Sequence, residues 1–153
     1  MVKEKLKIYL DTSVISAYFD ERLLERQGYT KSSWKILKNY DIYISQLVLK
    51  EINNHPDTIK RNKMLQLVKN FKILSIETKE IKELAQEYVK KKIIPEKYWE
   101  DALHLACASV NELNILTSWN YAHLLKLNTK TRVNAINILL GYKPIELVEP
   151  PML

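Results

Sequence analysis

The stretch Lys7-Ile8-Tyr9-Leu10-Asp11-Thr12-Ser13 sets the pattern from which the fold of this chain is predicted. Its first four residues form a short β-type run, and Thr12 or Ser13 is suited to cap a helix directly behind it. The same order recurs at Ile42-Tyr43-Ile44, after which Ser45 is expected to cap the next helix. The chain is thus predicted to begin with two strand–helix units.

The remaining sequence continues this alternation. Apolar runs predict further strands at residues 73–76, 114–117 and 145–148. Helical spacing of apolar residues predicts helices at 14–19, 30–40, 47–52, 59–71, 81–89, 96–111, 120–125 and 129–140. Strands that alternate with helices are typical of a parallel sheet covered on both faces. We therefore predict a three-layer α/β/α sandwich with a central, mainly parallel sheet, formed by one domain at 1–149 and a tail at 150–153.

Composition excludes several classes of function. The 153 residues include only two glycines, too few for a Gly-rich phosphate-binding loop, and a single cysteine, which excludes a disulfide framework and a multi-cysteine zinc site. No signal peptide or membrane span is recognisable, so a cytoplasmic protein is expected. The formal net charge of +6 favours polyanionic partners such as nucleic acids.

Two acidic residues occur where a ligand site is expected. Asp11 directly follows the first strand, and parallel sheets bind ligands beyond the carboxyl ends of their strands; a turn or helix-capping role would equally place an Asp there. Glu51 shares a helix face with the apolar Leu47 and Val48. A carboxylate facing inward needs a cation or a metal, whereas a Glu at the rim of that face would need neither.

A third acid and an amide follow in the second half. Asp101 opens a helix that is apolar almost all round, so it is drawn toward the buried side, although an acid in a first turn also suits the helix dipole. Asn120 follows the strand at 114–117 and is suited either to cap a helix or to offer an oxygen to a divalent ion. Hydroxyls at the same rim could contact water or phosphate: Thr12, Ser13, Thr117 and Ser118.

Together these residues indicate a hard-metal site in a basic protein. Clustered carboxylates repel one another, and oxygen ligands select ions such as Mg²⁺ or Mn²⁺. Such an ion offsets phosphate charge and activates a water for phosphodiester attack. The basic residues that follow Asn120 are candidates for phosphate contacts: Lys126, Lys130 and Arg132.

At this point the chain resembles the PIN-domain nucleases and, within them, the VapC-type toxins. The resemblance covers roughly residues 6–147 and is carried by four stretches in the order of the family: Tyr9–Ile15, Leu47–Ile52, Glu100–Ala108 and Leu116–Leu124. By motif position, Asp11, Glu51 and Asp101 would be the metal-site acids. Asn120 falls where many members carry a fourth acid, and it removes one charge from the site.

The resemblance implies a function and partners. It implies Mg²⁺- or Mn²⁺-dependent cleavage of single-stranded RNA with 5′-phosphate and 3′-hydroxyl products, a homodimer, and a cognate antitoxin that covers the site. Asp11 and Asp101 would then hold the ion, Glu51 would complete the shell or orient the water, and Asn120 would hold a metal-bound water or the phosphate.

Other functions stay open at this stage. Asn120 favours a catalytically weak or inactive domain that binds RNA or protein without cutting. An aspartyl-nucleophile phosphatase would need a second Asp where Ser13 stands, and a receiver domain would need an acidic pair that Asp11-Thr12 does not supply.

Overall fold

The computed structural model describes residues 4–153, which fold around one five-stranded sheet. The strands are β1 (Lys7–Leu10), β2 (Asp41–Ser45), β3 (Lys72–Leu74), β4 (Ile115–Thr117) and β5 (Glu146–Val148). The α-helices are α1 (Thr12–Tyr18), α2 (Leu24–Leu37), α3 (Gln46–Asn53), α4 (Thr58–Val68), α5 (Lys79–Lys90), α6 (Trp99–Val110) and α7 (Leu127–Leu139). Two short 3-10 helices are η1 (Glu96–Tyr98) and η2 (Pro150–Met152).

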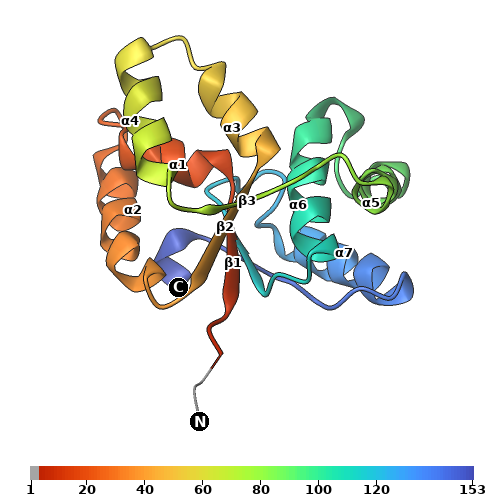
Figure 1. Cartoon of the computed structure of the whole chain (residues 1–153). Helices are drawn as coiled ribbons and strands as arrows, with labels where there is room; N and C mark the ends of the chain where they lie inside the picture. The colour runs from red at the N-terminus through yellow and green to blue at the C-terminus, as the bar shows by residue number, and fades with distance from the viewer. Residues whose placement is uncertain (1–3) are drawn as a thin grey trace.

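The sheet has the order β3-β2-β1-β4-β5, and all four neighbouring pairs are parallel. Each parallel pair needs a crossover connection, and here the crossovers are helices. Figure 1 shows α1, α2 and α4 on one side of the sheet and α5, α6 and α7 on the other. The predicted three-layer α/β/α sandwich with a parallel sheet is confirmed.

The central strand and one helix form the middle of the core. In β1, Ile8, Tyr9 and Leu10 are fully buried. In α6, every residue from Ala102 to Ser109 is buried, as its nearly continuous apolar sequence predicts. Since β1 ends and α6 begins near the same edge of the sheet, polar residues at those two points are fixed by well-packed elements.

The start of α1 differs from the sequence prediction. Asp11, and not Thr12 or Ser13, is the N-cap: it has an extended backbone, and its Oδ1 accepts a hydrogen bond from the Ser13 backbone N–H at 3.0 Å. An Asp that directly follows a strand already has the extended conformation that a cap requires, so the helix begins at Thr12, two residues before the predicted start at 14.

The helix predicted at 120–125 does not form. Residues 121–126 are turns, although Asn120 O accepts from the backbone N–H groups of both Leu124 and Leu125. This single turn ends because Lys126 has an extended backbone and starts α7 at Leu127. One turn fixes several residues for few hydrogen bonds and does not propagate by itself.

The last residues lie against the domain. Pro150 is buried, and η2 packs against α2. Within residues 4–153, no helix is both long and apolar enough to cross a membrane.

A buried polar contact between α5, α6 and α7 gives a stability prediction. Asn137 is fully buried, accepts a hydrogen bond from the Tyr88 hydroxyl and donates to Ser109 Oγ at 3.0 Å. Asn137→Ala should lower the free energy of unfolding by about 1–3 kcal/mol because it leaves buried partners unsatisfied. The control Ile138→Ala, at an exposed position, should change it by less than about 0.5 kcal/mol. Urea unfolding measures both, and equal midpoints for the two variants would contradict this account.

Candidate active site

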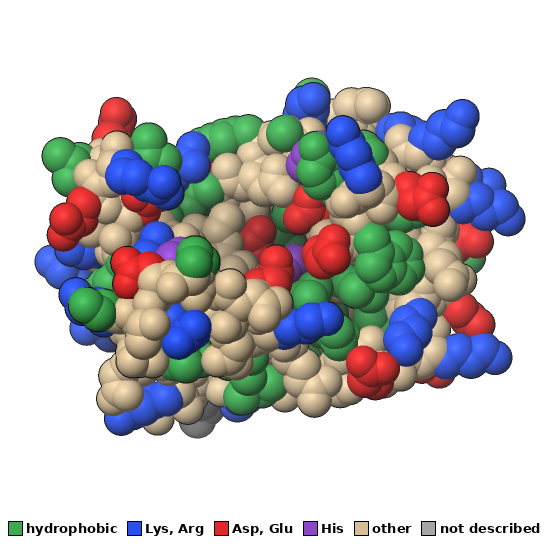
Figure 2. All heavy atoms as spheres, turned by 90° about the horizontal axis from the view of Figure 1, so that it is seen from above, with side chains coloured by type: hydrophobic (Ala, Val, Ile, Leu, Met, Phe, Trp, Pro, Cys, Tyr) green, Lys and Arg blue, Asp and Glu red, His purple; other side chains and the backbone are tan. Residues whose placement is uncertain are grey.

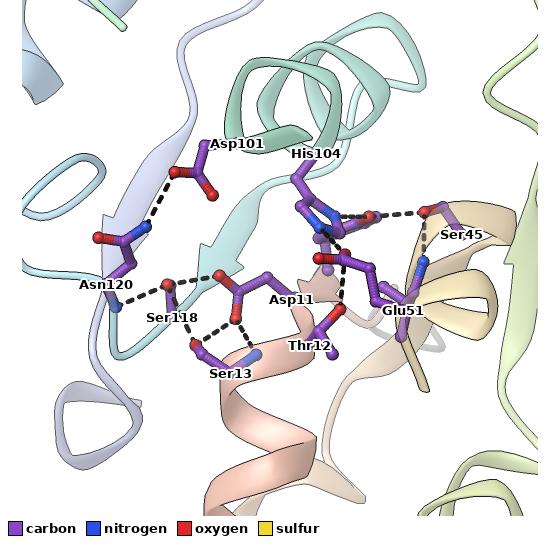
Figure 3. A network of polar contacts seen from close by, with 11 residues as sticks. Asp11, Thr12, Ser13, Ser45, Glu51, Asp101, His104, Ser118 and Asn120 are labelled. Carbon is purple, nitrogen blue, oxygen red and sulfur yellow. Dashed lines mark hydrogen bonds and ion pairs between the residues drawn. The ribbon is translucent and has the colours of Figure 1, made fainter. Parts of the chain in front are cut away.

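The predicted site residues come together at the carboxyl edge of the sheet. Asp11 follows β1, Thr117 ends β4 with Ser118 directly behind it, and Glu51 and Asp101 come from α3 and α6. Figure 3 shows their side chains directed toward one region, with Asp11 between the other two acids. This arrangement results from the sheet order, which places β4 and β2 on either side of β1.

Asp11 is held by hydroxyl groups from two elements. Its Oδ2 accepts a hydrogen bond from Ser118 Oγ at 2.6 Å, and its Oδ1 accepts from both the Oγ and the backbone N–H of Ser13. Ser13 Oγ in turn accepts from the Trp119 backbone N–H at 2.9 Å. Ser13 and Ser118 therefore fix the orientation of a carboxylate that is only 4% exposed.

Glu51 is bound by a buried histidine. Its Oε1 lies 2.6 Å from His104 Nε2 and accepts a hydrogen bond from Thr12 Oγ1 at 2.9 Å. His104 follows Asp101 by three residues on α6, so both side chains leave the same face of that helix. Glu51 is thus placed by α1 and α6 as well as by its own helix.

Asp101 contacts the side-chain amide of Asn120. Asn120 Nδ2 donates to Asp101 Oδ2 at 3.1 Å, while Asn120 Oδ1 accepts from the His123 backbone N–H at 3.1 Å. The Asn120 backbone N–H donates to Ser118 Oγ at 2.9 Å. Asn120 therefore has one of the two roles considered for it, because its Oδ1 caps a local turn. The oxygen that was expected to face an ion is engaged in that cap, and Asp101 is contacted instead by the amide nitrogen.

The three acids differ in their electrostatics. Burial raises the pKa of Asp11, and the nearby His104 and the serine hydrogen bonds only partly oppose this shift. Burial also raises the pKa of Asp101, where the charge of Asp11 adds to the effect and His104 opposes it. For Glu51, burial is outweighed by the hydrogen bond and charge of His104, which lower its pKa.

The donor chemistry fits a hard divalent ion that keeps part of its water shell. Among residues 4–153, no three His, Cys, Asp or Glu side chains are arranged to hold a metal ion by themselves. The predicted cage of three acids is therefore not preformed, and Glu51 is engaged by His104. Mg²⁺, however, commonly binds through only one or two carboxylates plus water. Asp11 and Asp101, whose charges repel across a buried space, are the pair that such an ion would neutralise.

A cleft gives access to two of the three acids. Glu51 and Asp101 line a depression of about 330 Å³, together with Leu47, Lys50, Asn54, Tyr98 and Glu100. Figure 2, viewed onto this edge of the molecule, shows acidic side chains gathered in a central hollow with basic side chains around the rim. Beside it, Thr117 Oγ1 is buried with no hydrogen-bond partner in the described part of the chain.

The three basic residues predicted to contact phosphate, Lys126, Lys130 and Arg132, differ in their surroundings. Lys126 is exposed and Lys130 is half-buried on α7. Arg132 is bound to the backbone carbonyls of Lys91 and Lys92, at 2.6 and 3.3 Å, so its guanidinium secures the end of α5. The exposed Lys50, beside Glu51, lines the acidic cleft and was not among the sequence candidates.

Known structures with similar folds are toxin–antitoxin proteins. VapBC2 from Rickettsia felis, bound to a promoter DNA fragment, aligns with a TM-score of 0.60 and 16% identity over 94% of this chain and 98% of the other. A toxin–antitoxin complex from Klebsiella pneumoniae gives 0.58 and 17% over 80% and 93%. VapC20 from Mycobacterium tuberculosis, a sarcin-ricin loop cleaving toxin, gives 0.57 and 17% over 76% and 92%.

These structural likenesses, at such low identity, establish the fold. No curated protein matches this chain in sequence. The sequence model of the PIN domain matches residues 8–118, a range that contains Asp11, Glu51, Asp101 and Ser118. The matched residues make up most of the chain, which therefore belongs to the PIN domain family.

Proposed function

We propose that this chain is a Mg²⁺- or Mn²⁺-dependent endoribonuclease that cleaves single-stranded RNA, and that it acts in the cytoplasm as the toxin of a type II toxin–antitoxin pair. The observation that carries the proposal is the gathering of Asp11, Glu51 and Asp101 at one strand edge of a PIN domain. Similarity to VapBC complexes supports a cognate antitoxin as partner. A homodimer follows only from the resemblance to the VapC-type toxins.

The proposed residue roles follow from their environments. Asp11 and Asp101 would hold the ion, which when bound would offset phosphate charge and activate a water. Glu51, whose pKa is lowered, stays ionised and would orient the attacking water by accepting a hydrogen bond from it. Asn120 orients the Asp101 carboxylate through its amide. The water oxygen would bond to phosphorus as the bond to the 3′ oxygen breaks, leaving a 5′-phosphate and a 3′-hydroxyl.

One observation favours a second candidate function. Asn120 supplies no charge where many PIN-domain nucleases carry an acid, and no preformed three-ligand group exists among the described residues. The chain could then bind RNA or protein without cutting. Retained RNA binding by the wild type without any cleavage in Mn²⁺ would identify that function.

The nuclease proposal predicts the effect of neutralising the buried acids. Asp11→Asn and Asp101→Asn keep the side-chain shape but remove the charge that an ion requires, so each should lower the rate of RNA cleavage at least about 100-fold. Labelled single-stranded RNA with Mn²⁺ and purified protein gives the rates. Glu83→Gln, at an exposed acid on α5, is the control and should cleave like the wild type. Equal rates in all four proteins would point to a contaminating nuclease.

Burial of Asp101, to which the charge of Asp11 adds, predicts a pH-dependent stability difference. Asp101 has a raised pKa in the folded protein, so its charged form opposes folding and the neutral form does not. Without metal, Asp101→Asn should therefore melt higher than the wild type at neutral pH. This advantage should shrink as the pH falls through the raised pKa, since the wild-type carboxyl then becomes neutral too. A difference independent of pH, measured by calorimetry, would argue against this cause.

Metal binding predicts stabilisation of the wild type alone. At free Mn²⁺ about 100-fold above its dissociation constant, binding contributes about 2.7 kcal/mol. For a chain of this size that raises the melting temperature by about 5–10 °C. Asp11→Asn should show little of this increase. A wild-type melting curve unaffected by Mg²⁺ and Mn²⁺ would remove the metal site from the proposal.

A further inference from the structure

A continuous hydrogen-bond chain lies behind Glu51, inside the core. His104 Nδ1 lies 2.6 Å from the Tyr9 hydroxyl, and that hydroxyl lies 2.8 Å from Ser45 Oγ. Ser45 Oγ also accepts from the Val48 backbone N–H at 3.4 Å. The chain therefore joins β1, β2, α3 and α6 at the point where Glu51 Oε1 meets His104 Nε2.

The members of this chain have almost no contact with solvent. Tyr9 and Ser45 are fully buried, and His104 is 3% exposed. A buried tyrosine hydroxyl needs a partner, and the edge-on packing of the Tyr9 and His104 rings further restricts rotation of the imidazole. Two ring nitrogens with fixed partners allow His104 only one orientation.

Every group of this hydrogen-bond network has a partner when His104 is neutral; when the ring is charged, Nε2 still faces Glu51 but the Ser45 O–H has no acceptor in the network. With a neutral ring, Nε2–H donates to Glu51, while Nδ1 accepts from Tyr9, whose hydroxyl accepts from Ser45. With a charged ring, both nitrogens donate and the Tyr9 hydroxyl donates to Ser45 Oγ. In both cases the same ring nitrogen faces Glu51, so the geometry does not depend on a proton.

The contacts on Glu51 fall on one oxygen. Thr12 and His104 both bind Oε1, whereas within residues 4–153 no hydrogen bond reaches Oε2. The Glu51 side chain is about one third exposed and lines the cleft that Asp101 also lines. Fixing Oε1 from behind leaves Oε2 for a ligand in the cleft.

We propose that Tyr9, together with Ser45 and His104, is a positioning residue for Glu51: the buried chain holds Oε1 so that Oε2 is presented to the reacting water. This inference rests on the proposed ribonuclease function. None of the three residues touches substrate in this arrangement, and each acts through the residue in front of it. Partners behind metal-site and catalytic groups commonly control rate in this way.

Two buried tyrosines of this protein provide a matched pair of variants that tests whether Tyr9 positions Glu51. Tyr9→Phe removes one hydroxyl from this network. Tyr88→Phe removes one from another fully buried tyrosine, whose hydroxyl binds Ser109 and Asn137. Tyr9→Phe should lower kcat about 10- to 100-fold and leave KM for RNA within about twofold. Tyr88→Phe should leave both within about twofold, even if it destabilises the fold comparably.

A second readout does not need activity. In the wild type, the His104 Nε2–H proton should give a slowly exchanging, downfield signal in NMR spectra of ¹⁵N-histidine-labelled protein. Tyr9→Phe should shift or broaden this signal, because the imidazole loses its rear partner, and Tyr88→Phe should not. If the wild type cleaves no RNA, the ribonuclease proposal fails, while this signal still decides whether Tyr9 fixes His104.

If Tyr9→Phe does not fold, two variants of His104 test the same proposal. His104→Gln can still donate an amide N–H toward Glu51, whereas His104→Leu cannot. Cleavage at least about fivefold faster in His104→Gln than in His104→Leu, with both folded by circular dichroism, supports positioning through a donor. Equal rates in this pair, or a Tyr9→Phe protein that matches Tyr88→Phe in kcat or in the His104 signal, would overturn the proposal.

Discussion

The site depends on carboxylate charge that is buried at Asp11, directly after β1, and partly buried at Glu51 on α3 and Asp101 on α6. A buried carboxylate is stable only with hydrogen bonds or opposite charge around it. Asp11 receives these from Ser13 and Ser118, and Glu51 receives them from Thr12 and His104. The donors come from elements far apart in sequence, so the carboxylates also hold the strand edge together. The same contacts that allow the acids to be buried therefore determine their directions.

The environments also divide the acids into two kinds. The hydrogen bond and charge of His104 outweigh burial and lower the pKa of Glu51, whereas burial raises the pKa of Asp11 and of Asp101, and the charge of Asp11 adds to the shift of Asp101. Groups with opposite shifts in one site commonly have different tasks. This supports Asp11 and Asp101, whose charged forms are destabilised, as the pair that a cation would neutralise, and Glu51 as an ionised acceptor that orients the water.

The fold was largely predictable because its signals are local. The apolar run of β1, the cap at Ser45 and the all-round apolar sequence of α6 each specify an element from a few neighbouring residues. The turn at 121–126 was missed because it shares its pattern with a helix but lacks the length to propagate. Asp11, Glu51 and Asp101 are each explained by an ordinary role when taken alone. They were recognisable as a set, and because they occupy the motif positions of the PIN-domain resemblance. The role of Arg132 at the end of α5 was not recognisable, since it depends on a contact 40 residues away.

The hydrogen-bond chain formed by Ser45, Tyr9 and His104 could not be predicted from the sequence. A tyrosine in a buried strand signals that its hydroxyl must find a partner, but β-type spacing says nothing about which one. The partner becomes definite only when β1 lies beside β2 and α6 packs across them, which brings together residues separated by 36 and 95 positions. A buried polar network that is fully satisfied is also more rigid than its separate hydrogen bonds. An acid that must present one oxygen to a reacting water is served by such rigidity, and this network ends at Glu51, whose Oε2 accepts no hydrogen bond from the described residues.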